Sequence, residues 1–161
     1  MSKTLVFADK LLSLRGQIDI TEQEGQLSYQ ARGDFSLFRT RWRVFREGHE
    51  VAMIRRKLFS LSPTYHISGQ LGEMVLTRKF LALNRQYTVA GGSYDGATFT
   101  GNLFDLAFQI EHQGRPLAQA REKLISMRDK HRLEVLSDDA DDELFTVIVM
   151  VVMQMEKRDK D

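Results

Sequence analysis

An apolar run near the end of the chain constrains its fold more than any other feature. Residues 144–155 read LFTVIVMVVMQM, and only Thr146 and Gln154 interrupt the run. A helix of this length spans roughly 18 Å, which is too short for the ~30 Å hydrocarbon core of a bilayer. Because it is apolar on every side, such a helix has to be surrounded by protein.

The charged residues beside this run follow the order that a helix dipole favours, acidic before and basic after. They are Asp138, Asp139, Asp141, Asp142 and Glu143 before the run, and Lys157, Arg158 and Lys160 after it. We therefore predict a buried helix over about residues 142–156, with the acidic residues capping its N-terminus. A long core strand is the alternative, since five of the twelve residues are Val or Ile, although strands usually run only about 5–6 residues.

The body of the chain, from Leu5 to Leu136, reads as short β-strands separated by turns that contain glycine. Three-residue hairpin loops are predicted at 23–25, 46–48 and 112–114, each with its glycine in the left-handed conformation. Many short strands at this spacing are typical of a sandwich or a barrel. Together with the apolar run they predict an all-β fold in which a closed barrel surrounds one buried helix.

Length and composition restrict the classes of function. The 161 residues suit one domain, 1–161, with a single sizeable core. Lys and Arg total 23 against 22 Asp and Glu, a net charge of +1, so nucleic acid is not an expected partner. The absence of cysteine excludes disulfides and thiolate chemistry. The first ten residues are not a signal peptide, and we expect a cytoplasmic protein without a transmembrane segment.

A pattern of six residues occurs twice at a constant offset of 66, since 114 − 48 = 66. The first copy is Gly48, Ala52, Arg55, Lys57, Leu58 and Ser60, and the second is Gly114, Ala118, Arg121, Lys123, Leu124 and Ser126. We interpret this as duplication of a β-meander, with half-repeats at about 36–68 and 102–136 that close one barrel. The alternative is that the two hairpins use the same residues for the same structural reasons, glycine for the turn and alanine for close packing, without a duplication.

The run from Trp42 to Leu61, followed by Tyr65 and Ile67, resembles the first half of the LURP-one-related family. Its echo at 108–135, with the acidic step and the apolar helix that follow, resembles the second half. The resemblance covers nearly the whole chain and includes no catalytic motif. It implies the Tubby-like fold, a twelve-stranded antiparallel barrel threaded by a hydrophobic C-terminal helix, which the phospholipid scramblases share.

A basic strand is the strongest candidate for a site. Arg39, Arg41 and Arg43 alternate with apolar or small residues, so that the arginines face outward while Trp42 and Val44 face inward. With a three-residue loop at 46–48, the predicted register pairs Arg43 with Val51, Arg41 with Met53, Arg39 with Arg55 and Trp42 with Ala52.

The hypothesis is an anion or lipid-headgroup site made of Arg39, Arg41, Arg43, Arg55 and Lys57. Residues 39–57 hold seven basic and two acidic side chains, a local net charge of 7 − 2 = +5, and guanidinium groups fork onto phosphate oxygens. Tubby proteins bind phosphoinositides through basic residues, so the resemblance points the same way. The alternatives are a solvated face that pairs with the acidic segment 134–143 and, for Arg55 and Lys57, structural ion pairs repeated at Arg121 and Lys123.

No other pattern in the sequence predicts a site. The four histidines are scattered, the glycines of 91–96 lack the ending of a phosphate loop, and no serine sits in a nucleophile elbow. We therefore expect no catalytic residue, metal or cofactor. The predicted function is a non-catalytic Tubby-like module that binds an anionic ligand or an acidic phospholipid headgroup at a membrane surface. A protein–protein interaction domain is the second hypothesis, and an enzyme with an unrecognised site is the third.

Overall fold

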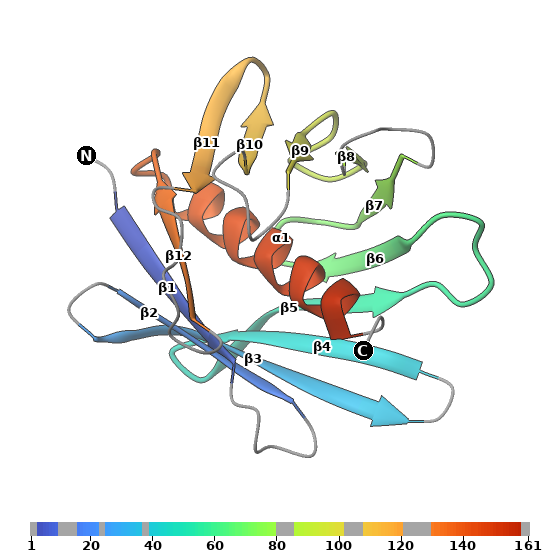
Figure 1. Ribbon diagram of the computed structural model, residues 1–161, viewed down its shortest axis with the longest axis horizontal. Helices are drawn as coiled ribbons and strands as arrows, with labels where there is room; N and C mark the ends of the chain where they lie inside the picture. The colour runs from blue at the N-terminus through green and yellow to red at the C-terminus, as the bar shows by residue number, and fades with distance from the viewer. Residues whose placement is uncertain are drawn as a thin grey trace.

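The computed structural model describes residues 3–9, 16–22, 25–36, 39–79, 86–101, 108–120 and 130–158, and in these ranges the chain forms twelve strands and one helix (Figure 1). The strands are β1 (Lys3–Asp9), β2 (Gln17–Glu22), β3 (Leu27–Ser36), β4 (Arg39–Arg46), β5 (His49–Arg56), β6 (Thr64–Gly69), β7 (Met74–Arg78), β8 (Gln86–Ala90), β9 (Thr98–Thr100), β10 (Gln109–His112), β11 (Arg115–Ala120) and β12 (Lys130–Val135), and the helix is α1 (Ala140–Arg158).

Each strand pairs antiparallel with its neighbours in the chain, and the first and last strands close the ring. The closure between β1 and β12 places Leu5 opposite Leu133 and Lys3 opposite Val135. Figure 1 shows the helix lying inside the wall that these strands form. The predicted all-β fold, a closed twelve-stranded barrel around one C-terminal helix, is confirmed.

The helix fills the barrel, as its all-round apolar character predicts. It begins two residues before and ends two residues after the predicted span of 142–156. Residues 144–155 all lie within this helix, so the core-strand alternative is wrong, and none of their side chains is more than 4% exposed. Asp139 caps the helix, because its Oδ1 accepts from the Asp141 N–H at 2.8 Å and its carbonyl accepts from the Glu143 N–H at 3.1 Å.

The β4–β5 turn differs from the predicted three-residue loop. Arg46 pairs with His49, so only Glu47 and Gly48 form the turn, both with positive φ of 50° and 78°. Two-residue hairpin turns commonly have positive φ at both positions, because this conformation matches the twist of the flanking strands. The pairing then shifts by one residue between Phe45–Glu50 and Val44–Ala52, which leaves Val51 as a bulge.

The shorter turn and the bulge together move the predicted register by two residues. Arg43 lies opposite Met53, Arg41 opposite Arg55 and Trp42 opposite Ile54. Trp42 and Val44 are nonetheless fully buried, as predicted, because a shift of two residues keeps every side chain on its face.

The β10–β11 hairpin repeats this geometry at the offset of 66. Gln113 and Gly114 form its two-residue turn in place of the predicted loop 112–114, and the register shifts beside Leu117 as it does beside Val51. The next pairings also correspond, since Ala52 lies opposite Gly69 and Ala118 opposite Val135. The duplication and its bounds at 36–68 and 102–136 stay a prediction, because 102–107 and 121–129 lie outside the described residues. The turn glycine of 23–25, Gly25, has the predicted positive φ, whereas residues 23 and 24 also lie outside.

Candidate functional site

The structure brings four arginines together on the outer surface of β3, β4 and β5. Arg32 on β3 lies opposite Arg43 on β4, and Arg41 on β4 lies opposite Arg55 on β5. We call Arg32, Arg41, Arg43 and Arg55 the arginine face. Arg32, Arg43 and Arg55 are exposed and Arg41 is partly buried.

The other predicted site residues lie at the margins of this face. The backbone of Arg39 pairs with Ser36, while its side chain lies outside the described residues. Lys57 is exposed just beyond β5, and its N–H donates to the Thr64 carbonyl at 2.8 Å. Arg56 and Arg46 also contribute to the local charge, but they are not part of the arginine face. Arg56 lies opposite buried Tyr65, and the Arg46 guanidinium lies 5.9 Å from the Tyr29 ring centre.

Part of the arginine face is compensated by neighbouring side chains. Arg43 Nε lies 4.0 Å from Glu50 Oε1, and both side chains are at least 40% exposed. Arg32 Nε donates to Gln30 Oε1 at 2.8 Å, and its guanidinium lies 5.1 Å from the centre of the Phe45 ring. Exposed contacts of this kind stabilise a fold by little.

Arg41 and Arg55 have no such partner. Asp34 lies opposite Arg41 on β3. Across the residues that the structure describes, however, neither arginine forms an ion pair or hydrogen bond with this carboxylate or any other. Like charges directly opposite each other on a sheet are destabilising, so this pair is the least compensated part of the face.

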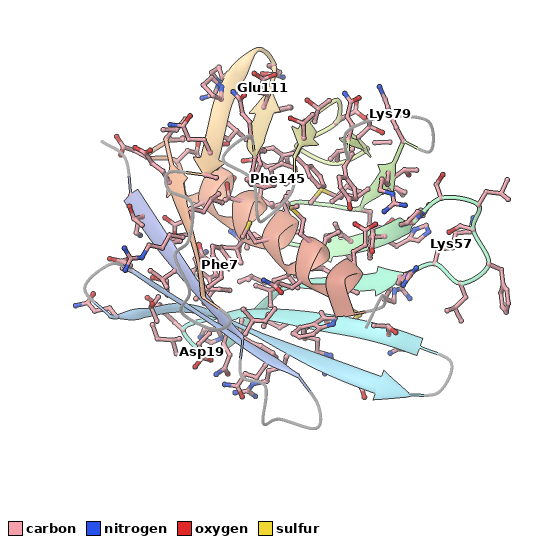
Figure 2. All side chains as sticks on the ribbon, in the orientation of Figure 1. Phe7, Asp19, Lys57, Lys79, Glu111 and Phe145 are labelled. Atoms are coloured by element: carbon pink, nitrogen blue, oxygen red, sulfur yellow. The ribbon has the colours of Figure 1, made fainter. Side chains whose placement is uncertain are left out.

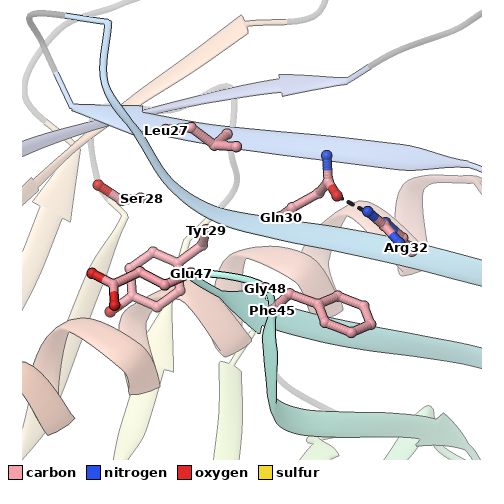
Figure 3. A pocket seen from close by; sticks show the side chains of 8 residues that line it. All are labelled: Leu27, Ser28, Tyr29, Gln30, Arg32, Phe45, Glu47 and Gly48. Atoms are coloured by element: carbon pink, nitrogen blue, oxygen red, sulfur yellow. Dashed lines mark hydrogen bonds between the residues drawn. The ribbon is translucent and has the colours of Figure 1, made fainter.

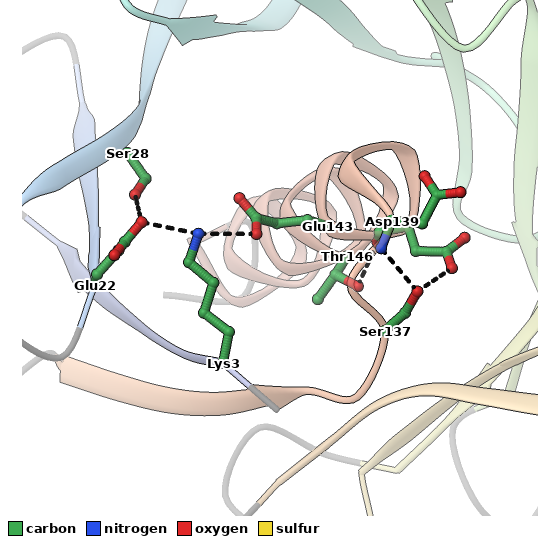
Figure 4. Close-up of polar contacts among 8 residues, drawn as sticks. Lys3, Glu22, Ser28, Ser137, Asp139, Glu143 and Thr146 are labelled. Carbon is green, nitrogen blue, oxygen red and sulfur yellow. Dashed lines mark hydrogen bonds and ion pairs between the residues drawn. The ribbon is translucent and has the colours of Figure 1, made fainter. Parts of the chain in front are cut away.

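Three acidic residues of the segment 134–143 make contacts at the N-terminal end of the helix, namely Asp139, Asp142 and Glu143. Glu143 and Glu22 both contact Lys3, at 3.1 and 2.8 Å from its Nζ, and join the helix to β1 and β2 (Figure 4). Buried Asp142 accepts hydrogen bonds from the Tyr94 hydroxyl at 2.7 Å and from Ser137 Oγ at 2.6 Å. Burial, and then the bond to Asp142, raises the pKa of the Tyr94 hydroxyl above its usual range. Within the described ranges no ion pair joins this segment to Arg41, Arg43 or Arg55. The alternative that the two charged segments pair stays a prediction, because the side chain of Arg39 lies outside the described residues.

The far end of the helix carries a second buried carboxylate. Glu156 is 2% exposed and its Oε1 accepts a hydrogen bond from Arg78 on β7. Burial, and then the negative charge of Glu156, raises the pKa of the nearby Tyr65 hydroxyl well above its usual range. The bond between Arg78 and Glu156 joins the last turns of α1 to β7.

A surface pocket of about 160 Å³ adjoins the arginine face (Figure 3). It is lined by Leu27, Ser28, Tyr29, Gln30, Arg32, Phe45, Glu47 and Gly48. Burial, and then the charge of Glu143, raises the pKa of Tyr29 to about 12. Because Arg32 and Glu47 are its charged side chains, the pocket has no net charge to attract an anion by itself.

Sequence patterns missed Arg32 and this pocket. Alternation along 27–32 places Arg32 on the outer face, but nothing in the sequence says that it lies opposite Arg43. That neighbour depends on the register between β3 and β4. As for other chemistry, the described residues bring no three His, Asp or Glu side chains together in a way that could hold a metal ion.

Comparison with known protein families shows which family the chain belongs to. The model of the LURP-one-related family matches residues 3–154. The chain belongs to the LURP-one-related family. The span matched in this LURP-one-related protein begins at the first residue of β1 and ends inside α1, so that it includes all twelve strands described. A comparison with curated proteins finds no match.

Family and fold are together consistent with a Tubby-like domain. The described part of this LURP-one-related protein contains no helix that is long and apolar enough to cross a membrane. The one described helix instead has its apolar surface covered by the barrel.

Proposed function

We propose that this LURP-one-related protein is a non-catalytic, cytoplasmic Tubby-like domain that binds the headgroup of an acidic phospholipid at a membrane surface. The binding residues are Arg41 and Arg55, with Arg43, Arg39 and Lys57 beside them and Arg32 as an addition from the structure. The observation that carries the proposal is the direct opposition of Arg41 and Arg55 without a carboxylate partner in the described residues.

A phosphate group fits this arrangement for a physical reason. Two guanidinium groups on adjacent strands repel each other, and an anion bound between them converts that repulsion into two attractions. Each guanidinium offers paired N–H donors that match phosphate oxygens. The backbones of β4 and β5 are fixed by pairing on both sides, so little ordering is needed on binding.

The test is co-sedimentation with vesicles of neutral phosphatidylcholine, with and without acidic lipid, at near-physiological salt. We expect binding that requires acidic lipid, weakens as salt rises, and falls by about tenfold or more in Arg41→Glu and Arg55→Glu, since each removes an attraction and adds a repulsion. Arg132→Glu is the matched control, because Arg132 is also exposed but lies on β12, opposite Val6 of β1.

Two results would contradict the proposal. One is an absence of binding at every lipid composition, which would favour the protein-interaction hypothesis. The other is an equal loss of binding in Arg41→Glu and Arg132→Glu, which would mean that overall charge and not the arginine face attracts the membrane.

A further inference from the structure

The loop between β5 and β6 exposes three large apolar side chains in four residues. Phe59 is fully exposed, Leu61 is 98% exposed and Leu58 is 47% exposed. Exposing a large apolar side chain to water costs free energy. A cluster of such side chains on the surface of a soluble protein usually marks an interaction site. In Figure 2 this loop, which begins at Lys57, stands out from the barrel.

Hydrogen bonds order the C-terminal half of the loop. Ser60 Oγ and Thr64 Oγ1 both donate to the Ser62 carbonyl, at 2.6 and 2.9 Å. The Arg78 N–H donates to the Pro63 carbonyl at 3.1 Å, which ties the end of the loop to β7. These hydrogen bonds therefore connect the exposed tip of the loop to the barrel.

The backbone at the tip is strained. Phe59 has a φ of 60°, in the left-handed region that aromatic residues rarely adopt. Strain of this kind recurs at functional sites. Here it accompanies a side chain that points into solvent and makes no core contact to offset its cost.

The charges around the tip suit one partner. No acidic residue occurs from Val51 to Gly72, whereas Arg55, Arg56 and Lys57 lead directly into Leu58. An apolar tip bordered by basic residues matches the boundary between acyl chains and anionic headgroups. Arg55, which lies opposite Arg41, is only four positions from Phe59, so the arginine face and the tip can contact one membrane surface together.

We propose that the loop 57–63 inserts Leu58, Phe59 and Leu61 into the outer acyl region of an acidic bilayer while the arginine face contacts the headgroups. This inference rests on the proposed function, because the acidic headgroups draw the loop to the surface. It adds an apolar contribution that the arginine face cannot make.

The first experiment measures insertion directly. Trp42 is the only tryptophan and is fully buried, so it gives a constant background. In Phe59→Trp, we expect the fluorescence to shift to the blue on adding vesicles of phosphatidylcholine with phosphatidylserine. We also expect quenching by lipids brominated in their acyl chains. If the introduced indole keeps an emission typical of water while the protein sediments with the vesicles, the inference is overturned and a protein contact for the loop is favoured.

The second experiment separates this inference from the proposed function. Phe59→Ser/Leu61→Ser should weaken vesicle binding by about tenfold or more without changing thermal stability, because both side chains are exposed in the folded state. Leu27→Ser is the control, since Leu27 is 59% exposed but lies outside the loop. Unchanged binding of the double variant, together with lost binding in Arg55→Glu, would overturn the insertion and leave the proposed function standing. An absence of wild-type binding would overturn both.

Discussion

At the scale of single residues, Gly69 shows how one position shapes the wall behind the arginine face. It lies opposite Ala52, beside the bulge at Val51, and has a φ of 134°. A Cβ at this position would lie 2.4 Å from the Val51 carbonyl oxygen and 2.8 Å from the Ala52 Cα. The Gln70 N–H donates to the same carbonyl at 2.9 Å, so the bulge is fixed in place.

We expect Gly69→Ala to lower the free energy of unfolding by about 2–4 kcal/mol, because the methyl group adds a backbone clash to an unfavourable φ. Gly48→Ala is the matched variant. Gly48 has a φ of 78° with no atom within 4 Å of an added Cβ, so only the conformational cost of about 1 kcal/mol applies. Urea denaturation of both variants provides the check, and equal losses would mean that the close contact at Val51 relaxes without cost.

At the scale of elements, Lys3 joins three of them. It extends from β1 and contacts Glu22 on β2 and Glu143 on α1. Burial lowers the pKa of Lys3, but the bonds to Glu22 and Glu143 outweigh it and leave a raised value. The hydrogen bond from Lys3, more than any other contact, lowers the pKa of Glu22 below its usual 4.5. This contact ties the N-terminal turn of the helix to the seam where the barrel closes.

Replacing Lys3 by Met should lower stability at pH 7 by no more than about 1 kcal/mol, since Lys3 and Glu22 are each more than a third exposed and water screens the pair. The contribution of Glu22 is present above its unfolded pKa near 4.5 and is lost as the pH falls through its lower folded value. Urea denaturation at pH 7 and at pH 3 checks this, and the difference from wild type should be smaller at pH 3. A difference that grows on acidification would contradict the pairing.

The elements that could be predicted from the sequence are those specified by local patterns. The helix follows from the apolar run and its charged flanks. The positions of the turns follow from their glycines, which can adopt the left-handed conformation. The register of β4 and β5 could not be predicted, because the bulge at Val51 depends on Gly69 in another strand. The opposition of Arg41 to Arg55 depends on that bulge, so the sequence indicates which residues form the basic face but not which arginines meet.

At the scale of the whole molecule, the barrel and the helix share one core. The interior side chains of all twelve described strands surround a helix whose residues 144–155 are almost completely buried. A core built in this way cannot be divided, because neither the wall nor the helix has another partner for its apolar surface.

A charge in the middle of the helix should therefore prevent folding. An unpaired carboxylate in Val149→Asp costs several kcal/mol or more, which is comparable with the total stability of a typical domain. The control Val149→Ala should stay folded and lose about 2–3 kcal/mol through the cavity that it creates. Near-UV circular dichroism and size-exclusion chromatography distinguish the two variants. A monomeric Asp variant with the wild-type spectrum would show that the helix is not held as described.

The closed ring also determines when folding can be completed. The first strand pairs with the twelfth, and Lys3 bonds to Glu143, 140 residues further along the chain. Contacts between such distant residues form late, because the entropy of closing the chain is lost before they stabilise anything. On the ribosome the twelve described strands precede the segment that covers their inner faces. We therefore expect the nascent chain to carry uncovered apolar strand surfaces until α1 emerges, which makes the C-terminal helix the step that ends its exposure to aggregation and to chaperones.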